Sequence, residues 1–119
     1  MALFALSQTH CDIPLRVVHF DQDREMHIVG EYAQGEILIG HDIPRSELRQ
    51  TVSHECGHAL EDTVKHTKEY RSLFGKPPFV NSYASKDGED FAESYAMYMD
   101  GKLPRGKKFS FIRSFLSKL

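Results

Sequence analysis

The sequence predicts an α+β fold, with a small antiparallel or mixed sheet followed by helices, and three observations lead to this class. Short apolar, β-branched runs occupy the first third of the chain. From about residue 45 onward, apolar residues recur at the spacing of an α-helix. Glycine and proline separate the later helical segments. With 119 residues, 1–119 are expected to form a single domain with a modest core.

Three strands are expected before the helices. Leu15–Phe20 is a compact apolar run, Met26–Tyr32 alternates between apolar and polar residues, and Glu36–Gly40 is the third strand. The three residues Ala33-Gln34-Gly35 have the length and the glycine of a tight turn. The last two strands are therefore predicted to pair as a hairpin.

The longest helix is expected from Arg45 to His66. Asp42 is placed to cap it, and Pro44 suits its first turn, where the missing N–H costs nothing. The polar residues of this helix form a separate stripe from its apolar ones, which are Leu48, Val52, Ala59, Leu60 and Val64.

Three shorter helices are expected to follow. The first covers Thr67–Phe74 and ends at Gly75. The second is acidic, covers Glu89–Met99 and is expected to be capped by Asp87. The third covers Lys107–Lys118, and we expect it to cover the core with Ile112, Phe115, Leu116 and Leu119.

The composition bounds the partners and the compartment. Hydrophobic residues make up 40% of the chain and charged residues 27%, and the net charge is −2. Neither nucleic acid nor an anionic membrane is therefore an expected partner, and no stretch reaches the length of a transmembrane helix. Met1–Leu6 is apolar but too short, and lacks the basic residues of a signal peptide. We expect a cytoplasmic monomer, or a secreted one if the chain is a mature form.

The two cysteines, Cys11 and Cys56, are too few for a disulfide framework. Cys56 lies two residues after His54, which turns it toward the opposite side of the helix. We expect it to be a small buried residue with a free, inert thiol.

The residues His54-Glu55-Cys56-Gly57-His58 form an H-E-x-x-H motif inside the longest predicted helix. Side chains four residues apart share a helix face, so the two imidazoles can reach one metal ion. The glutamate between them can act on a water held by that ion, which is what a zinc hydrolase needs. A solvated surface helix with the same residues is the alternative.

A zinc hydrolase site takes a third protein ligand and leaves one place for water. The extension of the motif to a third histidine fails, because Glu61 and Val64 occupy the required positions. His66 lies too far along the helix. Glu89 and Glu93 share a face of the acidic helix, so one can bind the metal while the other accepts a hydrogen bond from a ligand histidine. A solvated acidic helix end is the alternative.

Several segments carry one combined pattern, and they are His54–Glu61, Asn81–Tyr83, Glu89–Ala96, Pro104 and Phe109–Phe115. From Glu31 to the C-terminus, this pattern resembles the zinc metallopeptidase domain of anthrax lethal factor and of the bacterial Pro-Pro endopeptidases. The pairing of the H-E-x-x-H helix with the acidic helix is the specific part of the resemblance. It implies a minimal zincin-like domain.

The resemblance also implies the roles of individual residues. It makes His54, His58 and Glu89 the ligands of one Zn²⁺ ion and Glu55 the general base. Glu93 then accepts a hydrogen bond from a ligand histidine. Tyr83, which would otherwise be read as a structural loop residue, donates a hydrogen bond to the developing oxyanion.

The expected function is that of a zinc-dependent endopeptidase, a hydrolase that cleaves a protein substrate with a metal-activated water and Glu55 as general base. We expect Glu36–Gly40 to form a sheet edge beside the cleft, where an extended peptide can add as a strand. The residues that set a Pro-Pro preference have no identifiable counterpart here, so that preference is not transferred.

Three alternatives stay open. One is a regulatory metallopeptidase of the ImmA type that cleaves a repressor inside the cell. The second is a non-catalytic binding module on a zinc scaffold, against which the intact Glu55 argues. The third is a metal-free structural domain.

Overall fold

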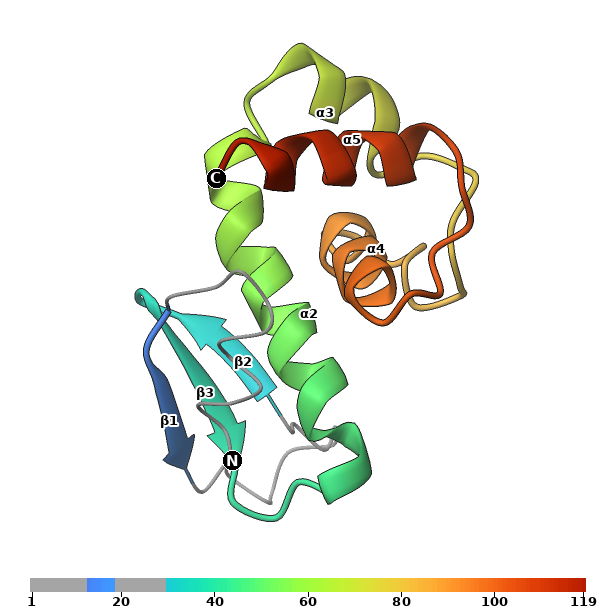
Figure 1. Ribbon diagram of the computed structural model, residues 1–119. Helices are drawn as coiled ribbons and strands as arrows, with labels where there is room; N and C mark the ends of the chain where they lie inside the picture. Colours follow the sequence, from blue (N-terminus) through green and yellow to red (C-terminus); the bar gives the residue numbers. More distant parts are fainter. Residues whose placement is uncertain (1–12, 19–29) are drawn as a thin grey trace.

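The computed structural model describes residues 13–18 and 30–119, which form an α+β arrangement. Within these residues lie a three-stranded mixed sheet and four helices (Figure 1). The predicted class is therefore confirmed at this level. Parts of the predicted strands, residues 19–20 and 26–29, lie outside the described residues, as does the segment Met1–Leu6.

The sheet has the order β1-β3-β2, with strands β1 (Leu15–Val18), β2 (Gly30–Ala33) and β3 (Glu36–Gly40). Strands β2 and β3 pair antiparallel, with Tyr32 opposite Ile37. Gln34 and Gly35 join them, and both have positive φ angles, 52° and 79°. Two such residues are typical of a type I′ turn, in which glycine relieves the steric cost. The predicted hairpin is confirmed.

The expectation that Glu36–Gly40 is an edge strand is wrong. Strand β3 lies at the centre, because β1 pairs with its other side in parallel. Its side chains Ile37 and Ile39 are buried in the core. The most apolar strand takes the central position, where both neighbours shield it. Among the described strands, β2 lies at an edge of the sheet and packs against α2.

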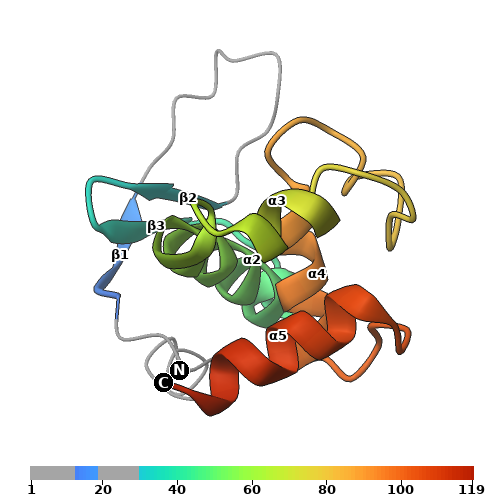
Figure 2. The ribbon, with the colours of Figure 1, turned by 90° about the horizontal axis from the view of Figure 1, so that it is seen from above.

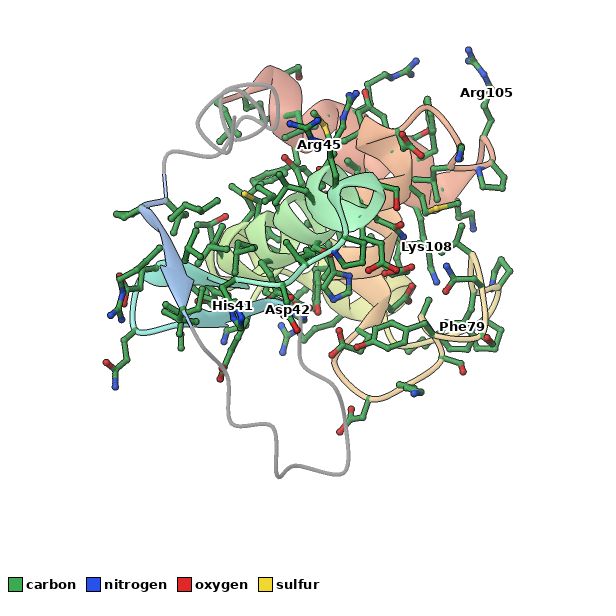
Figure 3. The ribbon with its side chains drawn as sticks, turned by 90° about the horizontal axis from the view of Figure 1, so that it is seen from below. His41, Asp42, Arg45, Phe79, Arg105 and Lys108 are labelled. Carbon is green, nitrogen blue, oxygen red and sulfur yellow. The ribbon has the colours of Figure 1, made fainter. Side chains whose placement is uncertain are left out.

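Helix α2 (Arg45–Val64) lies between the sheet and helix α4 (Figures 1 and 2). Pro44 occupies the cap position and no side chain caps the helix, so the predicted role of Asp42 is wrong. Asp42 lies in the turn between β3 and α2, next to His41 (Figure 3). The carbonyl oxygen of Pro44 instead accepts a hydrogen bond from Glu47 N at 2.9 Å in the first turn.

Cys56 lies on the buried side of α2 and is fully shielded from solvent. Its burial agrees with the prediction, but the expectation of a free thiol is wrong. Its sulfur takes part in a disulfide bond. A pairing between cysteines distant in the chain has no local signature in the sequence.

Three helices follow α2, and they are α3 (Lys68–Leu73), α4 (Asp90–Met99) and α5 (Lys107–Ser117). Glu89, not Asp87, is the residue before the first turn of α4, so the predicted cap is wrong. Leu119 lies beyond the end of α5 and is 66% exposed, contrary to its predicted place in the core. None of the described helices combines the length and apolar character needed to cross a bilayer.

Gly57 brings α2 and α4 unusually close together. A methyl group at this position would lie 2.7 Å from the Cα atom of Ala92 and 3.1 Å from its carbonyl oxygen. Only glycine leaves room for that approach. The two helices that carry the candidate site are therefore set by a backbone contact.

Lys108 of α5 fastens the start of α4. Its ammonium donates to Asp90 Oδ2 at 2.7 Å and to the carbonyl oxygens of Lys76 and Pro78. The same carboxylate oxygen of Asp90 accepts a hydrogen bond from Gly75 N. Lys108 also lies over the ring of Phe79 (Figure 3). This network fixes the residue that immediately follows Glu89.

Candidate metal centre

Two histidines and one glutamate converge where α2 faces the start of α4. His54 and His58 lie one turn apart, with ring centroids separated by 4.8 Å. Glu89 Oε1 lies 2.8 Å from His54 Nε2 and 3.0 Å from His58 Nε2. One ligand atom from each residue lies within 4.8 Å of the other two. The structure thus brings together the three residues that the sequence analysis named as ligands.

This donor set fits a metal ion in both chemistry and spacing. Two imidazole nitrogens and one carboxylate are ligands that zinc takes in hydrolase sites. Bonds from zinc to nitrogen and oxygen are about 2.0 Å long, so in a tetrahedral site the ligand atoms lie about 3.3 Å apart. The observed separations of 2.8 Å and 3.0 Å from Glu89 need to open by only a few tenths of an ångström. His54, His58 and Glu89 can therefore hold a metal ion.

Glu93 accepts a hydrogen bond from one of the two histidines, as predicted for the glutamate of the acidic helix that does not bind the metal. Its Oε2 accepts a hydrogen bond from His54 Nδ1 at 2.8 Å. The amide of Asn81 donates to its Oε1 at 2.9 Å, and Asn81 Oδ1 accepts from Ala84 N. The hydrogen bond from His54 holds the pKa of Glu93 below its usual value, against the effect of burial. Such a carboxylate fixes which ring nitrogen faces the metal.

Glu61 also lies beside a motif histidine, and the sequence analysis gave it no role. Its Oε1 lies 3.7 Å from His58 Nδ1, and its Oε2 accepts a hydrogen bond from the Tyr70 hydroxyl. The spacing of three residues from His58 was a usable signal, because residues three apart share a helix face. The part played by Asn81 had no such signal, since it comes from a loop.

Glu55 sits beneath the histidines with only 8% of its surface exposed. Burial raises the pKa of its carboxyl group, while the neighbouring His54 and His58 and a backbone N–H from Tyr32 act in the opposite direction. The result is a raised pKa, which moves the group toward the range of an effective general base. Strand β2 thus supports the residue predicted to be the base.

Both histidines have raised pKa values in the metal-free protein. Burial lowers the pKa of each ring, but the surrounding carboxylates outweigh it. For His58, chiefly Glu61, Glu55 and Glu89 raise the pKa to about 9. An excess of negative charge around two imidazoles favours a cation, whether a proton or a metal ion.

Tyr83 lies at the edge of the same site. Its ring is 5.7 Å from that of His54, measured between centroids, and the residue is 42% exposed. Burial and the charges of Glu89, Glu55 and Glu93 raise the pKa of its hydroxyl, so it stays protonated at neutral pH. A protonated phenol beside the cluster can donate a hydrogen bond.

A cavity of about 390 Å³ opens onto these groups. Its wall is rich in carboxylates, and none of the described residues that line it is a lysine or arginine. Strand β2 forms one side, α2 the floor, and the loop with Tyr83 the other side. The lining residues are Gly30, Glu31, Tyr32, His54, Glu55, His58, Glu61, Asp62, Tyr83 and Glu89.

No family model, curated protein or solved structure matches this chain.

Proposed function

We propose that this protein is a zinc-dependent endopeptidase with a zincin-like site, similar to the metallopeptidase domain of lethal factor and the Pro-Pro endopeptidases. One observation carries the proposal. His54, His58 and Glu89 converge at 2.8–3.0 Å inside an open cavity, with Glu55 between the two histidines in the chain. A structural zinc site is closed by four protein ligands, whereas this set leaves a side open to the cavity.

The chain's own residues supply the binding and the proton transfers. Zinc, when held by His54, His58 and Glu89, supplies a Lewis acid that polarises a carbonyl group and lowers the pKa of water. Glu55 takes a proton from the attacking water at its carboxylate and gives it to the leaving amine. Its raised pKa suits both steps, because a weakly basic carboxylate would hold the proton poorly.

Tyr83 stabilises the charge that develops on the scissile carbonyl oxygen. Its hydroxyl is protonated and stands on the open side of the site. One such donor contributes about 3 kcal/mol to transition-state stabilisation.

The substrate is a protein or peptide in extended form. Strand β2 pairs with β3 on one side, and its residues Gly30, Glu31 and Tyr32 line the cavity. An extended peptide laid along the outer edge of β2 can form main-chain hydrogen bonds while its scissile bond faces Glu55.

Two variants test the proposal in a peptide-library digest that is run with and without a chelator. Glu55→Gln keeps zinc but loses activity by about 10²–10⁴-fold, because only the proton transfer is removed. His58→Ala loses zinc and activity together. Unchanged cleavage by Glu55→Gln would contradict the mechanism, and a parent protein that binds zinc without cleaving any peptide would favour a binding module.

A further inference from the structure

Each motif histidine has a carboxylate beside the ring nitrogen that faces away from Glu89. For His54, this carboxylate is Glu93, at 2.8 Å from Nδ1. For His58, it is Glu61, at 3.7 Å from Nδ1. Both rings turn Nε2 toward Glu89. The two histidines thus have the same arrangement, with Nε2 facing Glu89 and a second carboxylate beside Nδ1.

Both of these carboxylates are anchored by a neutral donor from the segment that connects α2 to α4. Asn81 donates its side-chain amide to Glu93, and Tyr70 donates its hydroxyl to Glu61. In each case, the donor holds one carboxylate oxygen and leaves the other for the imidazole. A loop therefore supports His54, and helix α3 supports His58.

Tyr70 is itself held by the core. Its ring stacks on Phe74 at 5.2 Å and lies 5.9 Å from Phe91, both measured between centroids. Its backbone N–H donates to the hydroxyl of Thr67, which caps α3. The position of the Tyr70 hydroxyl is thus set by packing that does not involve the histidines.

We propose that Glu61, anchored by Tyr70, is a positioning residue for His58, and that helix α3 is for this reason part of the metal centre. The inference rests on the proposed metal site. The carboxylate of Glu61 lies 3.7 Å from His58 Nδ1, and its negative charge there favours a proton on Nδ1, which leaves Nε2 as the ligand atom. Tetrahedral ligands lie about 3.3 Å apart. The 3.0 Å contact of His58 Nε2 with Glu89 opens by only a few tenths of an ångström to reach that distance, so His58 keeps Glu61 beside its Nδ1.

The test measures metal affinity and a spectrum, using the full chain. Glu61→Gln removes the charge with little change in volume, and we expect the dissociation constant for zinc to rise by 10–100-fold. Tyr70→Phe removes only the hydroxyl, and we expect a rise near tenfold. Cobalt(II) replaces zinc as a spectroscopic probe. At saturation, both variants are expected to show a shifted visible absorption band, because the ligand field of His58 changes.

Two matched controls separate this role from general effects of the substitutions. Glu69→Gln removes an exposed carboxylate from α3, and Tyr98→Phe removes a hydroxyl that makes no hydrogen bond within the described residues. Both are expected to keep the parent affinity within about twofold and the parent cobalt spectrum.

The outcomes distinguish this inference from the proposed function. If the parent binds cobalt and both variants match it in affinity and spectrum, the role of Glu61 is overturned while the metal site stands. A purely structural role is indicated if the variants only lower the free energy of unfolding of the metal-free protein, which also overturns the inference. A parent that binds neither zinc nor cobalt overturns the proposed function and this inference together.

Discussion

Gly57 is the position at which α2 and α4 come closest, so enlarging it tests whether helix packing sets the metal centre. In Gly57→Ala, the new methyl carbon would lie 2.7 Å from Ala92 Cα and 3.1 Å from Ala92 O. Carbon atoms pack at about 3.5–4.0 Å. The helices must therefore separate by roughly 0.8 Å or more. Both neighbouring atoms belong to the backbone, so no side-chain rotation relieves the contact.

This separation acts on the metal site more than on the fold. Glu89 precedes Ala92 by three residues and moves with the start of α4. A metal site tolerates changes of only about 0.2 Å in its metal–ligand distances. Disturbing the residues around a metal typically weakens binding by about 10–100-fold, so we expect zinc to bind at least tenfold more weakly. Overpacking costs about 1–3 kcal/mol. The better helix propensity of alanine offsets about 1 kcal/mol, leaving a net destabilisation of about 0–2 kcal/mol.

The assay is a zinc titration against a competing chromophoric chelator, with urea denaturation of the metal-free protein in parallel. Gln50→Ala is the control, since Gln50 is exposed on the same helix and the substitution introduces the same residue, alanine. It is expected to leave zinc affinity unchanged. If Gly57→Ala folds and binds zinc within twofold of the parent, the approach of the two helices does not control the site.

Two further predictions concern stability. In the metal-free protein, the pKa of His58 is raised to about 9. Protonation of His58 therefore stabilises the fold fully below pH 6.5, and this stabilisation is lost as the pH rises toward 9. It contributes about 3 kcal/mol at most. Urea denaturation of chelator-treated protein from pH 6 to 9.5 measures it, and His58→Gln is expected to lack this fall in stability. A parent that loses no more stability than His58→Gln over this range would refute the assignment. Lys108→Met leaves Asp90, which is 4% exposed, without its cation. We expect a loss of about 3–5 kcal/mol, whereas Lys65→Met, at the exposed pair with Asp62, leaves the urea midpoint unchanged. Equal midpoints for the two lysine variants would contradict this.

The parts of the fold that the sequence predicted correctly depend on local signals. The turn at Gln34-Gly35 needs two residues with positive φ angles, and glycine at the second marks it in the sequence. Apolar residues at helical spacing predict helix α2, and it starts at Arg45 as predicted. The same periodicity placed His54 and His58 on one face, which is what the structure has.

The features that were missed depend on contacts between distant segments. The central place of β3 results from its parallel pairing with β1, and no local pattern in Glu36–Gly40 reports that partner. Asn81 reaches Glu93 from a loop, so helical spacing could not reveal it. Gly57 is one of the two variable positions of the motif, and its short distance to Ala92 explains why glycine stands there.

The predicted caps failed for a related reason. Asp42 and Asp87 are good capping residues by type, but the chain enters α2 through Pro44 and α4 through Glu89. At α4, the entry is fixed by the hydrogen bonds of Asp90 to Gly75 and Lys108, which come from other parts of the chain. Tertiary contacts thus override a local preference worth about 1 kcal/mol.

The most direct measurement is anomalous scattering at the zinc absorption edge from crystals grown with an equimolar amount of zinc. One strong peak is expected about 2.0–2.2 Å from His54 Nε2, His58 Nε2 and a carboxylate oxygen of Glu89, with the side toward the cavity left open to solvent. No peak at these atoms, or a zinc ion held instead by Glu93 and His54 Nδ1, would contradict the arrangement on which the proposed chemistry depends.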